Sequence, residues 1–184
     1  MKKRASMGVM AIALAFGVAV SGSGCTNTDP RLNGTWEGEA EGVLTRLVFD
    51  NGNFITEVYS DGFLPATRGT FTTSENTIAK RATHLHRRAF EQETGPEWLD
   101  RSAAAAILHE KDVGGEDARE IDAVIDVFFL NTTSQFILIA DSLSLTTTVS
   151  ASELARLADA FGICPSSIDD FFPTSVTQEF IRRN

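Results

Sequence analysis

The chain has 184 residues, a formal net charge of −9 at pH 7 and two cysteines. Residues 1–24 hold three of its 16 cations and no acid, so the other 160 residues carry 13 cations against 25 acids, a charge of −12. This negative charge repels nucleic acids and anionic lipid headgroups, and it argues against either as a main partner. A length of 160 residues suits one domain with a real core.

The first 25 residues have the pattern of an export signal. Three cations at residues 2–4 precede an apolar run over residues 7–20, which is too short to span a bilayer, and small residues follow up to Cys25. We therefore expect residues 1–24 to be a signal peptide. The polar residues 25–33 are expected to form a tether, and residues 34–184 to form a single domain.

Residues 22–24 and Cys25 together resemble the cleavage region of a bacterial lipoprotein signal. The resemblance implies that Cys25 becomes the first residue and carries lipid, which anchors the protein in the cell envelope, at the outer membrane or facing the periplasm. Two kinds of acyl attachment, diacylglyceryl and amide-linked, would hold it stably. The alternative is an ordinary secretory signal, which leaves Cys25 as a thiol that can pair with Cys164.

Strand signals dominate the next part of the chain. In residues 36–41 three glutamates share one face and leave Trp36 for the interior. Asn51-Gly52 is a strong hairpin signal, because both central residues of a type I′ turn need positive φ. Further strands are expected at residues 43–49, 54–59, 68–73 and 77–86.

The alternation stops after residue 86. Residues 87–120 are expected to contain a helix that begins at Gly95-Pro96 and has Trp98 on its apolar stripe. A capping box at residues 150–153 begins a helix through residue 161, and the apolar tail, with a possible second cap at 175–178, is expected to pack on the rest. Three more strands, which bring the total to eight, are expected at residues 122–130, 135–140 and 143–149.

Gly34-Thr35-Trp36 opens the first strand, eight strands follow, and a helix comes after the last. These features resemble the lipocalin or calycin group, in which the indole of a Gly-x-Trp plugs the closed end of a barrel. Residues 68–78 and 83–86 also resemble short sequence segments of lipocalin-like lipoproteins of uncharacterised function, notably from spirochaetes. The resemblance implies a mainly β, eight-stranded antiparallel up-and-down barrel with a helical excursion between strands five and six and C-terminal helices. It also implies a basic residue over Trp36, for which Arg156 is the nearest candidate.

Lys80 and Arg81 make the strand at residues 77–86 unusual. They are neighbours, so one cation points into the barrel in either register unless a bulge intervenes. A buried cation needs an acidic partner or a ligand. We expect Asp122 or Asp126 to be that partner, in preference to an anionic ligand.

His84 and His86 lie two residues apart on the same strand, so both rings leave one face, as in a metal-binding pair. A third ligand would have to come from the excursion: His109, Glu91 or Glu93. Arginines follow directly at residues 87–88 and disfavour a cation, so we expect no metal. Trp98 is expected to anchor the excursion on the core rather than to cover a ligand.

The sequence predicts binding rather than catalysis, since it holds no catalytic or cofactor motif. An eight-stranded barrel either is filled by side chains or holds one small ligand. We expect a small apolar ligand or, alternatively, an envelope or host protein, including an exported enzyme inhibited through residues 60–66. The candidate rim or ligand residues are Lys80, Arg81, His84, His86 and Trp98.

Overall fold

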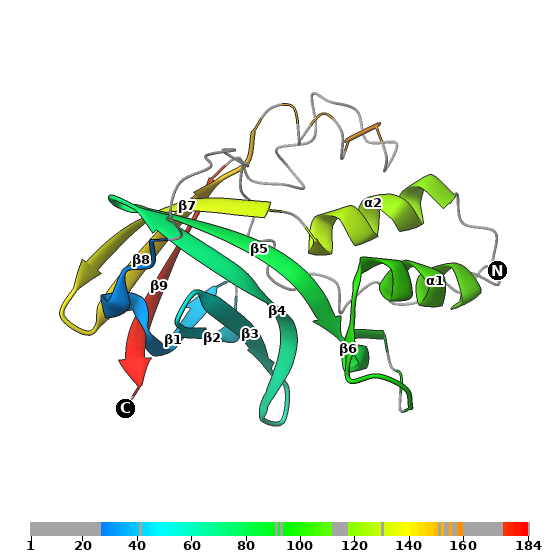
Figure 1. Cartoon of the computed structure of the whole chain (residues 1–184), viewed down its shortest axis with the longest axis horizontal. Helices are drawn as coiled ribbons and strands as arrows, with labels where there is room; N and C mark the ends of the chain where they lie inside the picture. The colour runs from blue at the N-terminus through cyan, green and yellow to red at the C-terminus, as the bar shows by residue number, and fades with distance from the viewer. Residues whose placement is uncertain are drawn as a thin grey trace.

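The computed structural model describes residues 27–40, 42–90, 92, 94–111, 118–129, 131–150, 152, 155, 158–159 and 175–183. The predicted signal peptide, Cys25, Cys164 and most of the helix predicted at residues 150–161 lie outside them. Within them the fold is mainly β, a closed eight-stranded antiparallel barrel with a few helices (Figure 1).

The barrel is closed because every strand pairs antiparallel with the next, β4 pairs with β5, and β9 pairs back to β1. Closure leaves the barrel wall without an open edge. A two-residue strand, β6 (Trp98–Leu99), pairs with the end of β5. The strands of the wall are β1 (Gly34–Ala40), β2 (Val43–Asp50), β3 (Asn53–Tyr59), β4 (Phe63–Ser74), β5 (Thr77–His86), β7 (Asn131–Ile139), β8 (Ser142–Thr148) and β9 (Ser175–Arg183).

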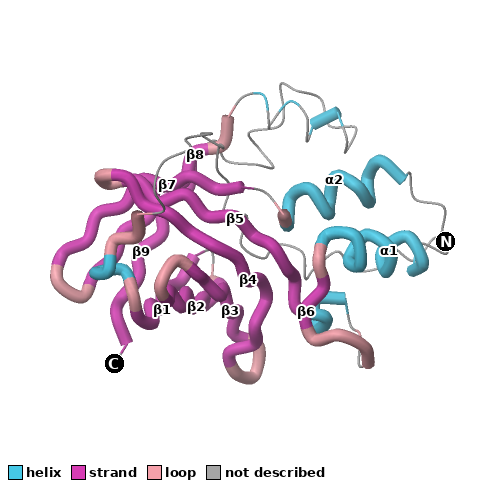
Figure 2. Tube along the Cα trace, viewed as in Figure 1, coloured by secondary structure: helices cyan, strands magenta, loops and turns pink. Residues whose placement is uncertain are grey.

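Between β5 and β7 the chain leaves the wall and forms the predicted helical excursion. It contains η2 (Arg87–Phe90), β6, α1 (Arg101–Lys111) and α2 (Ala118–Phe128). Figure 2 shows the two helices side by side at one end of the barrel. They have a core of their own, formed by Leu85, Phe90, Leu99, Ala104 and Ile125.

One predicted strand is wrong. The sixth strand, expected at residues 122–130, is instead largely the helix α2, where Ile121 and Ile125 are buried one helical turn apart. The eighth strand is β9 (Ser175–Arg183), in the tail expected to be helical. The barrel therefore has the predicted number of strands, but one of them comes from a different part of the sequence.

Successive strand connections alternate between the two ends of the barrel. The turns at residues 51–52, 75–76 and 140–141 lie at one end, together with the start of β1 and the end of β9. The β3–β4 turn and the excursion lie at the opposite end. We call the first the closed end, because residues 27–33 cross it (Figure 1), and the second the far end.

Large apolar side chains fill the half of the barrel next to the closed end. The rings of Phe49 and Phe71 meet edge to face with their centroids 4.8 Å apart. Contacts of this kind make the closed half a packed core rather than a hollow one. Its members are Leu32, Trp36, Leu47, Phe49, Phe54, Phe71, Ile78, Phe136, Leu143, Leu145 and Phe180.

Candidate ligand site in the barrel lumen

Trp36 lies fully buried at the closed end, and its Nε1 donates a hydrogen bond of 2.7 Å to the carbonyl oxygen of Leu32. The guanidinium of Arg182, on β9, lies over the indole at 4.4 Å from the ring centroid. Gly34 has a φ of +128°, which L side chains rarely adopt. The basic residue over Trp36 is thus Arg182, while Arg156, the predicted candidate, lies outside the described residues.

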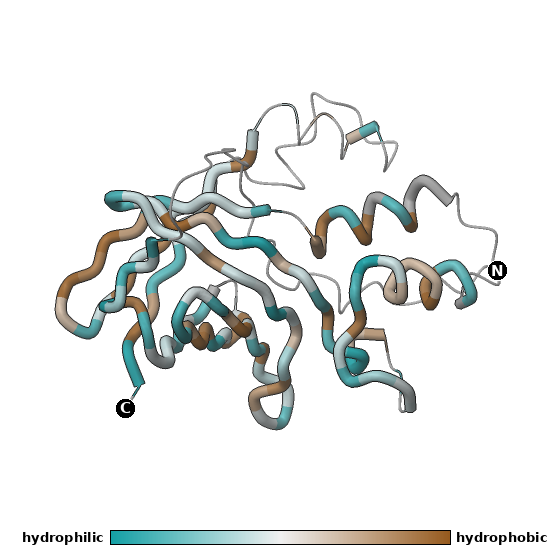
Figure 3. The backbone as a smooth tube through the Cα atoms, viewed as in Figure 1, coloured by the Kyte–Doolittle hydropathy of each residue, from teal (hydrophilic) through white to brown (hydrophobic). Residues whose placement is uncertain are grey.

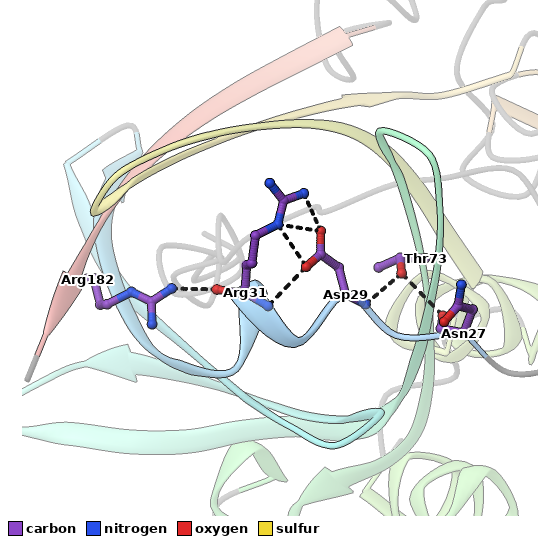
Figure 4. A network of polar contacts seen from close by, with 5 residues as sticks. All are labelled: Asn27, Asp29, Arg31, Thr73 and Arg182. Carbon is purple, nitrogen blue, oxygen red and sulfur yellow. Dashed lines mark hydrogen bonds and ion pairs between the residues drawn. The ribbon is translucent and has the colours of Figure 1, made fainter.

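Residues 27–33, expected to be a tether, pack across the closed end and are held on both sides (Figure 4). The backbone N–H of Thr73, on β4, donates to the carbonyl oxygen of Asn27 at 2.8 Å. On the opposite side the guanidinium of Arg182 donates to the carbonyl oxygen of Arg31. The segment is therefore part of the folded barrel and seals this end.

Toward the far end, polar side chains replace apolar ones at the inward positions. The register places Lys80 of β5 directly opposite Thr132 of β7, and Ser134 of β7 opposite Thr147 of β8. These four residues form one continuous stretch of wall over three neighbouring strands. The buried polar residues that face inward on the wall strands are Thr45, Lys80, Thr132, Ser134 and Thr147.

The hydrogen bonds of this polar wall are incomplete. The hydroxyls of Ser134 and Thr147 bind each other at 2.6 Å. The hydroxyl oxygen of Thr132 is buried and finds no hydrogen-bond partner. Lys80 is only 6% exposed, and in the described part of the chain no ion pair or hydrogen bond reaches its ammonium. Buried groups without partners are costly, so each of these two needs an explanation.

Burial lowers the pKa of the Lys80 ammonium to about 8, because loss of water disfavours the charged form. At pH 7 roughly nine-tenths of the ammonium groups stay protonated. The ring of Phe54 offers a weak contact, with its centroid 5.8 Å from Nζ. The lumen therefore holds a positive charge that no carboxylate among the described residues balances.

The acids expected to neutralise Lys80 lie elsewhere. Asp122 and Asp126 are on α2, where Asp122 meets Nε2 of His109 at 3.3 Å and Asp126 pairs with Arg101 of α1. The predicted internal ion pair is wrong, because the segment that was to carry it into the lumen is a helix. The alternative explanation for a buried cation, an anionic ligand, becomes the better one.

His84 and His86 contact different neighbours. Nδ1 of His84 lies 3.0 Å from the hydroxyl of Thr83, whereas the buried ring of His86 packs edge-on against Trp98, with centroids 5.2 Å apart. The guanidinium of Arg68 lies 4.7 Å from the centroid of Trp98. Trp98 thus fastens β6 to the end of β5. No cluster of three or more metal-ligating side chains occurs within the described residues.

Of the predicted candidates only Lys80 is a buried part of the lumen wall, since Arg81 is exposed on the opposite face of β5. Thr132 and Ser134, which lie near Lys80 on the wall, are not predicted from the sequence because residues 131–134 have the composition of a turn. The spacing of residues 132, 134 and 136 does indicate them, since inward positions of a strand recur at every second residue and Phe136 is apolar.

No helix within the described ranges is long and apolar enough to cross a membrane. Comparisons with known proteins find no matching family model, no matching curated protein and no matching solved structure. The function has to be inferred from the residues of the barrel itself.

Proposed function

We propose that this protein is a lipid-anchored, lipocalin-like binding protein of the cell envelope, without catalytic activity, and that its lumen binds a small, largely apolar molecule with one carboxylate. The observation that carries the proposal is the buried ammonium of Lys80, which lacks an acidic partner among the described residues and lies opposite the unpaired hydroxyl of Thr132. The signal pattern that ends at Cys25 supports the anchor.

A carboxylate supplies what both groups lack. One oxygen can accept a charge-assisted hydrogen bond from Nζ of Lys80, and the carboxylate can also accept from the hydroxyl of Thr132. Such bonds are strong inside a protein, because the surroundings screen charge poorly. The packed aromatic and aliphatic side chains of the closed half leave the polar wall as the place where the acidic group would be recognised.

The binding test compares decanoic acid with decanol, a ligand of the same chain length without the charge, by calorimetric titration of the mature protein. We expect the acid to bind more tightly, and Lys80→Met to weaken acid binding about thirtyfold, as the loss of a charged hydrogen bond would. Thr132→Val should weaken it less. Arg81→Met is the matched control, because it removes the neighbouring cation from the outer face.

Equal affinity for the acid and the alcohol would contradict the proposed ligand class. So would an unchanged affinity of the Lys80→Met variant for the acid. The anchor is tested separately by mass spectrometry of the protein purified from its own envelope. An unmodified Cys25 there would contradict the anchor and leave the lumen site standing.

A second candidate function, docking of an envelope or host protein, is favoured by an aromatic pair at the β3–β4 turn. Tyr59 is 52% exposed and meets Phe63 edge to face at 5.4 Å, and Arg46 lies 3.6 Å from the centroid of Phe63. Glu37 and Glu57 hold Arg46 in place. Photo-crosslinking from position 59 in the native envelope tests this docking function. A single protein adduct formed from position 59, and not from the exposed control position 94, would support it.

A further inference from the structure

Three exposed isoleucines gather on the outside of the barrel wall. Ile137 and Ile139 of β7 are 63% and 70% exposed, and Ile181 of β9 is 50% exposed. The register places Ser142 of β8 between Ile139 and Ile181, so that only a small side chain separates them. We call Ile137, Ile139 and Ile181 the isoleucine patch. A gathering of large apolar side chains in contact with water marks an interaction surface.

The isoleucine patch lies at the closed end. Ile139 is the last residue of β7, next to the turn at residues 140–141, and Ile181 comes directly before Arg182, which binds the segment at residues 27–33. In Figure 3 the end of β7 is the brown stretch at the left, across the barrel from α1 and α2. The patch and the excursion thus lie at opposite ends of the molecule.

The chain leads from the closed end directly to the proposed anchor. Cys25 precedes Asn27 by two residues, and the carbonyl oxygen of Asn27 is bound to β4 by the N–H of Thr73 at 2.8 Å. Two residues reach at most about 7 Å. Lipid on Cys25 would therefore hold the closed end at the surface of the bilayer, since two residues are too few to let the barrel turn over.

We infer that the closed end of the barrel rests on the membrane through the isoleucine patch, and that the far end, with the excursion, faces away from the lipid. The inference rests on the acylation of Cys25 proposed above. The side chains around the patch include both signs of charge, among them Glu179, Arg183 and Asp141, and the chain as a whole is acidic. The surface therefore fits zwitterionic rather than anionic lipid.

The test uses the acylated full-length mature protein in phosphatidylcholine vesicles that contain brominated lipid, with Cys164→Ser so that an added cysteine is labelled alone. An environment-sensitive fluorophore is placed at Ser142→Cys, within the patch, or at Thr94→Cys, an exposed position in the excursion. We expect the label at position 142 to be quenched several-fold more strongly than the label at position 94. Equal quenching, or stronger quenching at position 94, would overturn the inference.

A second set of variants shows whether the isoleucines themselves make the contact. In the Ser142→Cys protein, Ile139→Ser together with Ile181→Ser should remove most of the quenching, because the apolar surface that enters the lipid is lost. Tyr59→Ser is the matched control, since it removes an exposed apolar side chain from another part of the barrel. Unchanged quenching in the double variant would show that the anchor alone sets the orientation and would overturn the role of the patch.

The mass of the reconstituted protein is measured first, because it tests the acylation of Cys25 separately from the orientation of the barrel. A chain without lipid on Cys25 would contradict the proposed anchor and the orientation together. An acylated chain whose label at position 142 is not quenched would contradict the orientation only. The patch could instead join two copies of the protein. If the double variant changes its oligomeric state and loses no quenching, contact between the patch and the membrane is overturned.

Discussion

Replacement of Lys80 by Met should stabilise the protein, although most substitutions of buried residues destabilise. Burial lowers the pKa of Lys80 from 10.5 to about 8, and this difference corresponds to about 3 kcal/mol of unfavourable free energy for the charged form in the folded state. Met has a similar length and no charge, so it removes the penalty and keeps the packing. We therefore expect Lys80→Met to raise the free energy of unfolding at pH 7 by up to about 3 kcal/mol.

The pH dependence gives the same reasoning a second test. Lys80 loses its proton near pH 8 in the folded protein and near pH 10.5 in the unfolded chain, so between these values the unfolded chain binds more protons. The penalty is complete below pH 8 and is relieved as the pH rises through this window. The parent protein should therefore gain stability relative to the Lys80→Met variant between pH 8 and 10.5.

The assay is urea unfolding of the ligand-free parent and variant at pH 7 and pH 9.5, followed by circular dichroism. The difference between the two proteins isolates Lys80 from other groups that titrate in the same range. Arg81→Met is the control, because its side chain is exposed, and its effect should stay within about 0.5 kcal/mol. A Lys80→Met protein less stable than the parent at both pH values would show that the ammonium has a partner in solution, and would refute the reasoning.

Three further predictions concern the closure of the barrel, and urea unfolding checks the first two. Arg182→Met should lower the free energy of unfolding by about 2 kcal/mol, because it removes the cation over Trp36 and a hydrogen bond to residues 27–33. Arg183→Met, which removes an exposed ion pair, should lower it by less than about 1 kcal/mol. Equal losses for the two variants would contradict the role of Arg182. Gly38→Ala should lower the free energy of unfolding by about 3 kcal/mol, since the added Cβ would lie 2.2 Å from the backbone oxygen of Glu179. Gly42→Ala is the control: its Cβ would meet open space at a φ of +79°, and the loss should be only about 1 kcal/mol. A chain that ends before β9 should not form a monomeric barrel, because β1 and β8 would both lose a partner; a folded monomer in size-exclusion chromatography would contradict this.

The barrel could be predicted because its strands carry the two-residue alternation of a wall with one apolar face. The error at residues 122–130 has a physical reason. This segment is rich in Val, Ile and Phe, which favour strands, yet four apolar residues, Ile121 just before it and those at 124, 125 and 128, follow the spacing of a helix. Asp122 and Asp126, one turn apart on α2, each meet a basic side chain of α1. The spacing, rather than residue preference, was the better guide.

The last strand was harder to find in the sequence. Its inward positions are Val176, Gln178, Phe180 and Arg182, of which only two are apolar, so the alternation is weak. Arg182 belongs to the wall because its charge is used at the closed end, over Trp36 and on residues 27–33. Interactions between residues so far apart in sequence leave no local pattern, so the contact between Arg182 and Trp36 could not be predicted from the sequence.

The two ends of the barrel differ in the access that they give to Lys80 in the lumen. Trp36 and residues 27–33 block the closed end, so a ligand that reaches Lys80 has to pass the far end, where the excursion lies. The apolar core of the excursion shares no residue with the core of the closed half, and it meets the wall through Leu85 of β5. Among the described residues the side chains beside the far end and those of the closed half therefore form two apolar clusters, and β5 contributes to both.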